Sequence, residues 1–327
     1  MSRPALRPAL VPAAALAAAL ALGLTGCAPP TAGAPTVPAT GVTDAPVGSA
    51  TPAPAETPAE GPAVDQAVVD AALAALEAEF VARVGVQAID TGDGRVVEHR
   101  ADERFGFAST LKLPAAAVLL DRTTDAELAE VVRWSAADVE ASGYSPVTSE
   151  HVADGLPLGE VAEAAVRQSD NTAMNVVLER LGGPAGLDAA LAELGDDVTS
   201  VDRTEPGLND VVAGDPRDTT TPAAFATLLR AVAVDDALDP DDRATLLEWA
   251  SGNATGDALV RAGAPEGWVV ADKSGGAGPI RDDVALVTPP GRAPIVLVVL
   301  TTRDDPAAAY DDALVARTAE VVLAALR

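Results

Sequence analysis

The sequence predicts an α+β protein in which a five-stranded antiparallel sheet with flanking helices is joined to an all-helical part. Three observations predict this fold class. Alternating apolar and polar residues indicate two strands within residues 84–100 and three strands within residues 268–303. Between these groups, residues 107–262 show mostly helical patterns broken by glycine and proline. The simplest assembly pairs both groups of strands in one sheet and leaves the intervening residues as the helical part.

The first residues are predicted to be an export signal rather than part of the fold. In residues 1–27, Arg3 and Arg7 precede the apolar run VPAAALAAALALGL, which is too short for a membrane span. The run is followed by LTGC, which resembles the lipidation site of bacterial lipoproteins. Cys27 is therefore the expected point of lipid attachment, and an ordinary signal peptide with an incidental cysteine is the alternative.

Residues 28–63 are expected to form a tether between the lipid and the folded domain. They are rich in alanine, proline, threonine and glycine, and they contain no basic or aromatic side chain. Such a segment cannot bury enough apolar surface to offset the entropy lost on ordering, so we expect it to be disordered and stiffened by proline. This arrangement places the domain, residues 64–327, on the outer side of the cell membrane, either anchored there or released.

The elements of the domain follow in order. Apolar residues from Val64 to Phe80 recur at helical spacing, and VGVQAID and RVVEHR alternate on either side of a TGDG turn, which predicts a β-hairpin. WVVADKSG, DVALVTP and APIVLVVLTTR predict three strands, with a turn at GR between the last two. The segment DPAAAYDDALVARTAEVVLAAL predicts a final helix. Residues 64–106 and 263–327 thus form the predicted α/β part.

The composition argues against several kinds of partner. With 49 acidic and 22 basic residues the net charge is -27, so the surface repels phosphate backbones and we expect no nucleic acid partner. A well-hydrated surface is a sufficient explanation of this acidity. One cysteine permits no internal disulfide, and Cys27, His99 and His151 cannot form a Cys/His metal site. We expect neither a metal nor a cofactor.

The chain has two lysines, Lys112 and Lys273, and each completes a polar motif. Ser109 lies three residues before Lys112, so the two share one face if the segment FASTLKLP opens a helix. A serine hydroxyl becomes a good nucleophile when a base takes its proton. Lysine can do so when burial or a second cation lowers its pKa, whereas arginine does not deprotonate in proteins. A Ser-x-x-Lys spacing also arises by chance, so alone it has little specificity.

Two further motifs accompany this pair. Ser-Asp-Asn at residues 169–171 has a simple alternative as a helix N-cap. Lys-Ser-Gly at residues 273–275 lies on a predicted strand, where glycine lets a ligand approach the backbone, and a surface lysine near a strand end is the alternative. Together and in this order, the three motifs are the set found in class A β-lactamases and penicillin-binding proteins.

Residues 64–327 resemble a class A serine β-lactamase throughout. Beyond the three motifs, the segments that resemble this family are YSPVT, DNTAMN, LGGPAGL, DRTEPGLN, GDPRDTTTPAA and PPGRAP. The resemblance implies the two-domain β-lactamase/transpeptidase-like fold and a monomer. It also implies hydrolysis of the β-lactam amide of penicillins and cephalosporins, which confers resistance to these antibiotics.

The DRTEPGLN segment separates this family from its relatives. Penicillin-binding transpeptidases share the serine and lysine groups but lack this loop. In class A enzymes the glutamate and asparagine of E-x-x-L-N hold a water, and Glu205 and Asn209 match them. A carboxylate that activates water beside an ester on Ser109 allows turnover. The alternative is a DD-peptidase or β-lactam sensor that acylates without efficient turnover. The resemblance also implies an ion pair between Arg203 and Asp218 across this loop.

The resemblance further implies the catalytic roles. Ser109 attacks the lactam carbonyl, and the backbone N–H groups of Ser109 and Gly276 form the oxyanion hole. The serine proton goes either to Lys112 or, through water, to Glu205, and Ser169 passes a proton to the ring nitrogen. A non-catalytic binding lipoprotein, the second alternative, would be expected to have lost these groups.

Other residues are expected to bind the substrate. Asn171 would bind its side-chain amide, and Tyr144 would line the cleft wall. The substrate carboxylate is expected to bind at Lys273, Ser274 and Gly275 of the predicted strand. One arginine, either Arg261 or Arg281, is expected to complete this carboxylate site. The run KSGGAGPIRDD is one residue shorter than the resemblance suggests and has an unexpected proline, which leaves open the choice of arginine and the substrate range.

Overall fold

The computed structural model describes residues 63–327 of the chain. The predicted signal peptide with Cys27, and all of the predicted tether except its last residue, lie outside the described residues. Within the part that is described, no helix is both long and apolar enough to cross a membrane.

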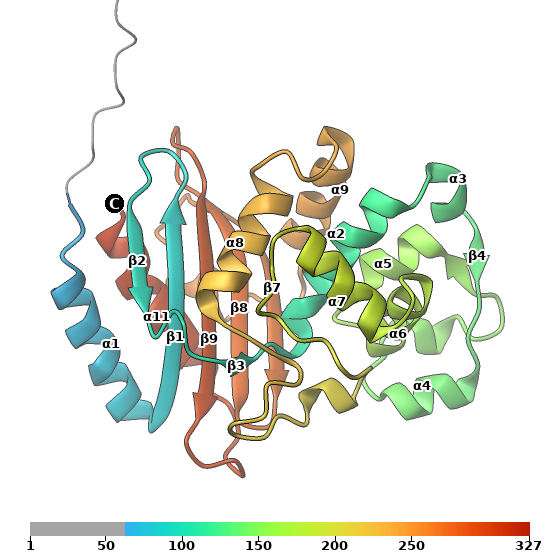
Figure 1. Cartoon of the computed structure of the whole chain (residues 1–327), viewed down its shortest axis with the longest axis horizontal. Coiled ribbons are helices and arrows are strands. Elements are labelled where there is room, and N and C mark those ends of the chain that lie inside the picture. The colour runs from blue at the N-terminus through green and yellow to red at the C-terminus, as the bar shows by residue number, and fades with distance from the viewer. Residues whose placement is uncertain (1–62) are drawn as a thin grey trace, which may run out of the picture. The chain divides into compact units, whose positions relative to one another are not determined.

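A five-stranded antiparallel sheet forms one side of the domain (Figure 1), as the sequence predicts. Its strands, in spatial order, are β2 (Val96–His99), β1 (Ala82–Asp90), β9 (Ile295–Arg303), β8 (Ile280–Thr288) and β7 (Val269–Ala277). The N-terminal hairpin joins the C-terminal strands through β1 and β9, where Val86 is opposite Val299. The predicted fold class is confirmed, and β7 is the edge strand nearest the helical part.

Both faces of the sheet are covered. The helices α1 (Gln66–Phe80) and α11 (Asp312–Ala325) pack on one face, where Leu297 and Val299 of β9 are buried with them. The neighbouring residues of β9, including Val298, point to the other face and join a second core. Because successive side chains of a strand alternate between faces, a strand buried on both sides is apolar throughout.

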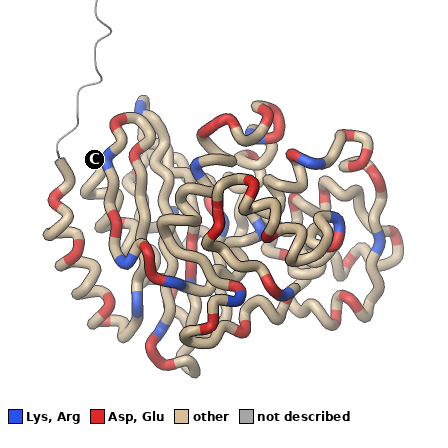
Figure 2. The backbone as a smooth tube through the Cα atoms, viewed as in Figure 1, with Lys and Arg blue, Asp and Glu red and all other residues tan. Residues whose placement is uncertain are grey.

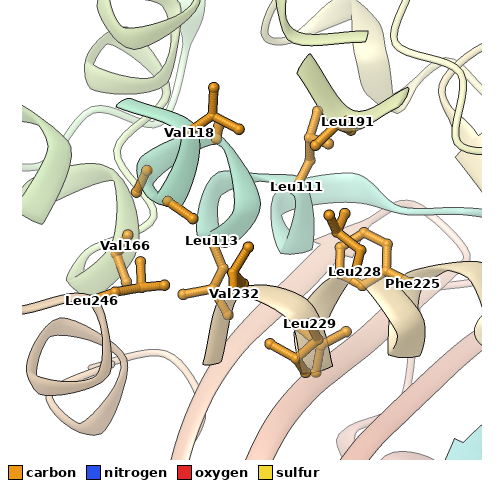
Figure 3. Packing of buried hydrophobic residues seen from close by; sticks show 14 of the residues in the cluster. Leu111, Leu113, Val118, Val166, Leu191, Phe225, Leu228, Leu229, Val232 and Leu246 are labelled. Atoms are coloured by element: carbon orange, nitrogen blue, oxygen red, sulfur yellow. The ribbon is translucent and has the colours of Figure 1, made fainter. Parts of the chain in front are cut away.

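The other face of the sheet is covered by α8 (Pro222–Ala233), which lies across β1 and β9. Phe225 and Leu229 of this helix lie above the strands, and Leu113 of the central helix α2 (Lys112–Arg122) lies near Val232 (Figure 3). Sequence analysis placed residues 107–262 together in the helical part, and α8 shows that this division is too coarse. One apolar core runs from the sheet into the helical part.

The helical part surrounds α2, whose residues from Leu113 to Leu120 are all buried. A helix that is apolar on all sides is suited to the centre of such a bundle. The other helices of this part are α3 (Asp125–Leu128), α4 (Ala136–Ser142), α5 (Leu158–Arg167), α6 (Asn171–Arg180), α7 (Pro184–Glu193) and α9 (Pro240–Ser251). The short helix α10 (Val260–Gly263) instead packs against α11 on the other side of the sheet. Three 3₁₀ turns are η1 (Ala108–Leu111), η2 (Thr148–Glu150) and η3 (Gly207–Asn209). Sequence analysis did not predict the short pairs β3 (Phe105–Gly106) with β6 (Thr219–Thr220), and β4 (Val131–Val132) with β5 (Leu156–Pro157).

The start of the last helix differs from the prediction. The sequence predicts a helix from Asp305, but α11 begins at Asp312, and the residues between form a loop. The side chain of Asp311 accepts a hydrogen bond from Ala313 N and caps the helix. The Tyr310 N–H donates to the carbonyl oxygen of Gly278 at 3.0 Å, which holds this loop against the β7–β8 turn.

Acidic residues are spread over the domain. In the view of Figure 2 they lie on the sheet side and on the helical side, interspersed with arginine, rather than gathered in one place. This distribution fits a hydrated surface better than a site for one cationic partner.

Candidate active site

The three sequence motifs meet in one pocket of about 400 Å³ beside the edge strand β7. They come from η1, from the turn between α5 and α6, and from β7 itself. The pocket is lined by Ser109, Tyr144, Ser169, Asn171, Asn209, Thr255, Ser274, Gly276, Arg281 and Tyr310. Packing of the helical part against the sheet thus brings together groups that lie far apart in the sequence.

Ser109 and Lys112 are neighbours across one turn. The 3₁₀ turn η1 runs directly into α2, and Lys112 Nζ lies 2.9 Å from Ser109 Oγ. Ala108, immediately before the serine, has a positive φ of 42°. A left-handed conformation in a residue with a side chain is strained, and such strain is often stored at functional sites.

The Lys112 amine is buried among oxygen atoms. Its Nζ lies 2.8 Å from the carbonyl oxygen of Ser169, 2.7 Å from Asn171 Oδ1 and 2.9 Å from Glu205 Oε1. An ammonium has three protons, so it cannot donate to all these atoms and to Ser109 at once. The contact with Glu205 does not have hydrogen-bond geometry, and we regard it as a Coulombic contact.

Burial and charge act in opposite directions on Lys112. Loss of water lowers the pKa of Lys112 below its ordinary value, because burial penalises the charged amine. The carboxylates of Glu205 and, to a smaller extent, Asp170 act against this shift. The result is an amine that is easier to deprotonate than a surface lysine, as a proton acceptor for Ser109 requires.

Glu205 is fixed in side chain and backbone. Its buried carboxylate accepts a hydrogen bond from Asn209 Nδ2 at 2.8 Å. Asn175 clamps its backbone, because Asn175 Oδ1 accepts from Glu205 N at 2.8 Å and Asn175 Nδ2 donates to Glu205 O at 2.9 Å. Asn209 Oδ1 is buried and has no protein partner within residues 63–327, so it can accept a hydrogen bond from a water beside the carboxylate.

An ion pair closes the loop that carries Glu205. Arg203 Nε lies 2.5 Å from Asp218 Oδ2, and Asp218 Oδ1 accepts the N–H groups of Asp202 and Arg203. The Asp218 side chain is fully buried, whereas that of Arg203 is 27% exposed. Arg203 Nη1 also donates to the carbonyl oxygen of Asp210, so one guanidinium joins both arms of the loop.

Residues of the Ser-Asp-Asn motif have different structural positions. Asp170 caps α6 and accepts hydrogen bonds from Val147 N, Thr148 N and Ala173 N, so the helix-cap interpretation is right for this residue. Ser169 has a positive φ of 57° and turns toward the pocket. Its Oγ lies between the two lysines of the chain, 3.4 Å from Lys112 Nζ and 3.2 Å from Lys273 Nζ.

Lys273 is fully buried behind the pocket lining, where its Nζ lies 3.2 Å from Ser169 Oγ and 2.8 Å from the carbonyl oxygen of Ser274. Burial, followed by repulsion from Lys112, lowers the pKa of Lys273 to about 7. Asp272 and Asp283 are the main anions that oppose this shift. A substrate carboxylate would supply a further anion and would favour the charged amine.

Two neighbouring glycines of β7 face opposite sides. A Cβ atom on Gly275 would lie 3.1 Å from the carbonyl oxygen of Phe107 and from Thr110 Cγ2. Gly275 is therefore required for close packing of η1 on the strand, and it does not line the pocket. The expectation that its backbone contacts substrate stays a prediction. Gly276 does line the pocket, beside Arg281.

The structure separates the two candidate arginines. Arg261 does not line the pocket, because its Nε lies 2.6 Å from the buried Asp272 and its Nη2 donates to the carbonyl oxygen of Ser251. Arg281 lines the pocket, with its Nε 2.6 Å from Asp312 Oδ1. Of the two candidate arginines, Arg281 thus lines the pocket and Arg261 does not, and the binding of a substrate carboxylate by either stays a prediction.

Sequence analysis missed several groups of the site. Thr255, whose Oγ1 lies 2.6 Å from Ser274 Oγ, comes from an unpatterned segment after α9. Tyr310 was assigned to the final helix. Tyr144 and Tyr310 are the two tyrosines of the chain, so the rarity that singled out the lysines also applies to them. Among the described residues, no cluster of His, Cys, Asp and Glu is arranged to hold a metal ion.

Comparisons with known proteins agree with this geometry. A model of the family described as "Beta-lactamase enzyme family" matches residues 68–326. A protein named "Beta-lactamase" from Amycolatopsis lactamdurans is 52% identical over 252 residues, which cover 77% of this chain and 83% of that protein. A protein of the same name from Bacillus subtilis (strain 168) is 49% identical over 249 residues, covering 76% and 81% of the two chains.

Solved structures are similar over the same region. The class A β-lactamase from Clostridium kluyveri DSM 555 has a TM-score of 0.77 and 40% identity, and the match covers 80% of this chain and 99% of that chain. A halotolerant bacterial β-lactamase has a TM-score of 0.76 and 44% identity, with 78% and 98% of the chains covered.

Proposed function

The chain belongs to the class A β-lactamase family, and from this premise we propose that it hydrolyses penicillins and cephalosporins through an ester on Ser109 that Glu205 helps to release. The class A resemblance and the hydrolase class inferred from the sequence are confirmed at family level. The roles of individual residues are our proposal. The observation that carries them is the bridge formed by one amine, since Lys112 Nζ lies 2.9 Å from both Ser109 Oγ and Glu205 Oε1.

Acylation is the first half of the reaction. Ser109 Oγ forms a bond to the lactam carbonyl carbon, and the carbon–nitrogen bond of the ring breaks. Lys112, or Glu205 acting through a water, takes the hydroxyl proton, and Ser169 delivers a proton to the departing nitrogen. The position of Ser169 Oγ within 3.4 Å of Lys112 Nζ supports this relay. The backbone N–H groups of Ser109 and Gly276 stabilise the negative oxygen that develops in the transition state.

Deacylation distinguishes a hydrolase from a protein that is merely acylated. Glu205 removes a proton from a water held with Asn209, the water oxygen bonds to the ester carbon, and Ser109 regains its proton as the ester breaks. The buried acceptor Asn209 Oδ1 beside the Glu205 carboxylate supports this placement of the water. General base catalysis of this kind contributes about 10²- to 10⁴-fold to rate.

Substrate binding uses polar and charged groups in the pocket lining and directly behind it. Lys273, Ser274 and Arg281 bind the carboxylate, Asn171 binds the side-chain amide, and Tyr144 covers one wall. Arg281 lines the pocket, and Lys273 lies behind the lining and is cationic below about pH 7; in a protein of strongly negative net charge these groups focus anion binding on this pocket.

The test is a pair of measurements on the purified protein. Wild type should hydrolyse a chromogenic cephalosporin, and Glu205→Ala should accumulate a stable adduct on Ser109, seen as a mass increase in that peptide. Glu150→Ala, which removes an exposed acid from the helical part, serves as the matched control and should turn over normally. A DD-peptidase or sensor would form a long-lived adduct in wild type and would barely respond to loss of Glu205. Absence of both turnover and adduct would leave a binding protein.

We also propose that the enzyme is a monomeric lipoprotein on the outer side of the cell membrane, from which it can be released. The LTGC segment after an apolar run supports lipidation at Cys27. Cys27→Ser should move activity from the membrane fraction to the medium, and an unchanged distribution would contradict the proposal. Expression in a sensitive host should raise the inhibitory concentration of penicillins, and Ser109→Ala should abolish this resistance.

A further inference from the structure

Both tyrosines of the chain, Tyr144 and Tyr310, line the pocket that contains Ser109. Tyr144 follows α4, whereas Tyr310 lies in the loop between β9 and α11. The other lining residues are small polar residues, Gly276 and Arg281, so the two rings are its main apolar surfaces. Tyr144 already has a role in the proposed binding mode, but Tyr310 has none.

Tyr310 is held in place by the sheet. Its N–H donates to the carbonyl oxygen of Gly278 in the β7–β8 turn at 3.0 Å. Its ring lies close to Gly276, because a Cβ atom on that glycine would be 3.3 Å from Tyr310 Cε1. The residue is 42% exposed, so part of the ring faces solvent in the pocket. A ring that is anchored on one side and open on the other is a suitable surface for a ligand.

Tyr310 also lies against the arginine that binds the carboxylate in the proposed function. The Arg281 guanidinium carbon lies 4.7 Å from the centre of the Tyr310 ring, and Arg281 Nε contacts Asp312 Oδ1. The guanidinium is therefore held between an aromatic face and a carboxylate. The carboxylate site and the aromatic surface are adjacent.

We propose that Tyr310 determines specificity by stacking on a planar or aromatic substituent of the β-lactam. This substituent is carried on the ring carbon that neighbours the carboxylate-bearing carbon. The inference rests on the proposed function, which places the lactam carbonyl at Gly276 and the carboxylate at Arg281. With these two ends fixed, a substituent beside the carboxylate lies on the Arg281 side of the pocket, where the Tyr310 ring stands. A methyl group at that carbon is too small to cover the ring.

A purely structural role for Tyr310 makes a different prediction. If the ring serves only to orient Arg281, its loss weakens binding of every substrate with a carboxylate by the same factor. If the ring contacts the substituent, its loss affects substrates with an aromatic group there more than those with a methyl group. The ratio of the two effects separates the roles.

The experiment compares two cephalosporins that have the same acylamino side chain. One carries a methyl group beside the carboxylate-bearing carbon, and the other carries an aryl-vinyl group that is not expelled during the reaction. Steady-state kcat/KM is measured for wild type, Tyr310→Ala and Tyr310→Phe. Tyr310→Ala should lower kcat/KM for the aryl-vinyl compound about 2- to 10-fold more than for the methyl compound. Tyr310→Phe should keep the wild-type ratio, because the ring and not the hydroxyl makes the contact.

Each other outcome overturns a defined part of the argument. An unchanged ratio in Tyr310→Ala, whether both rates fall together or neither falls, overturns the stacking contact. A loss of preference in Tyr310→Phe as large as in the alanine variant assigns the effect to the hydroxyl and overturns it as well. Retained turnover of the methyl compound shows that the alanine variant is folded. Failure of wild type to hydrolyse or be acylated by either compound overturns the proposed function itself, and the inference with it.

Discussion

Replacing Arg203 by alanine should slow deacylation much more than acylation. Arg203 closes the loop that carries Glu205 and Asn209, through the contact of its Nε with Asp218 Oδ2 at 2.5 Å. Ser109 lies outside this loop, on η1. A looser loop therefore disturbs the water-activating pair while leaving the nucleophile in place.

The magnitude follows from the burial of Asp218. Without the Arg203 side chain, the fully buried Asp218 carboxylate still accepts hydrogen bonds from the backbone N–H groups of residues 202 and 203, but it loses its cationic partner. Breaking a buried ion pair costs about 3–5 kcal/mol. Because the Arg203 side chain is 27% exposed, water reduces this cost, and we expect ~2 kcal/mol. That is about 30-fold in the equilibrium between closed and open loop, and it sets the upper limit on the loss of deacylation rate.

The assay is pre-steady-state hydrolysis of a chromogenic cephalosporin, in which the burst reports acylation and the later linear phase reports deacylation. In Arg203→Ala the linear phase should slow by about 10- to 30-fold and the burst rate by less than about 3-fold. Arg217→Ala is the matched control: it removes the same charge from the same loop, but Arg217 is 56% exposed and pairs locally with Asp215. It should leave both phases almost unchanged. Equal slowing of burst and linear phase in Arg203→Ala, or no slowing of either, would refute the reasoning.

Three further predictions follow from the same geometry. Lys273 has a pKa of about 7 in the free protein, so it is cationic below that pH and neutral above it; KM for substrates with a carboxylate should rise between pH 7 and pH 9. Lys273→Arg should flatten this profile in steady-state kinetics, because arginine stays charged. Asp170→Ala should lower the free energy of unfolding by about 3 kcal/mol, since several donors lose a buried carboxylate; a loss below about 1 kcal/mol in equilibrium denaturation would contradict this. Phe225→Ala should cost about 3–5 kcal/mol in the same experiment, because it leaves a cavity between α8 and the sheet, whereas an exposed site such as Val212→Ala should change little.

The strands could be predicted because their signal is local. Alternation along VGVQAID and the apolar run in APIVLVVLTTR are properties of a few consecutive residues, and they indicate strands before any partner is known. The start of the last helix could not be predicted in this way. The segment from Asp305 to Asp311 has helix-forming alanines, but it forms a loop that is joined to the β7–β8 turn by the hydrogen bond from Tyr310 N–H to the carbonyl oxygen of Gly278. Tyr310 was missed as a pocket residue for the same reason.

The candidate site shows the same division. The motifs around Ser109, Ser169 and Lys273 are recognisable because they occupy consecutive positions with a known chemistry. The choice between Arg261 and Arg281 is different, since both are arginines near the same strand in the sequence. Their environments separate them, because one is taken up by a buried carboxylate and the other opens to the pocket.

The amino-acid sequence by itself determined which chemical groups the protein has and the order in which they occur, including a serine, two lysines and the glutamate of the loop. Only the tertiary structure decided which of them meet. Lys112 reaches Ser169 and Glu205, far along the chain, and becomes an amine with a lowered pKa because packing removes its water. Sequence patterns express local conformation, whereas proximity and burial depend on how distant segments pack, and the reactivity of these groups depends on both.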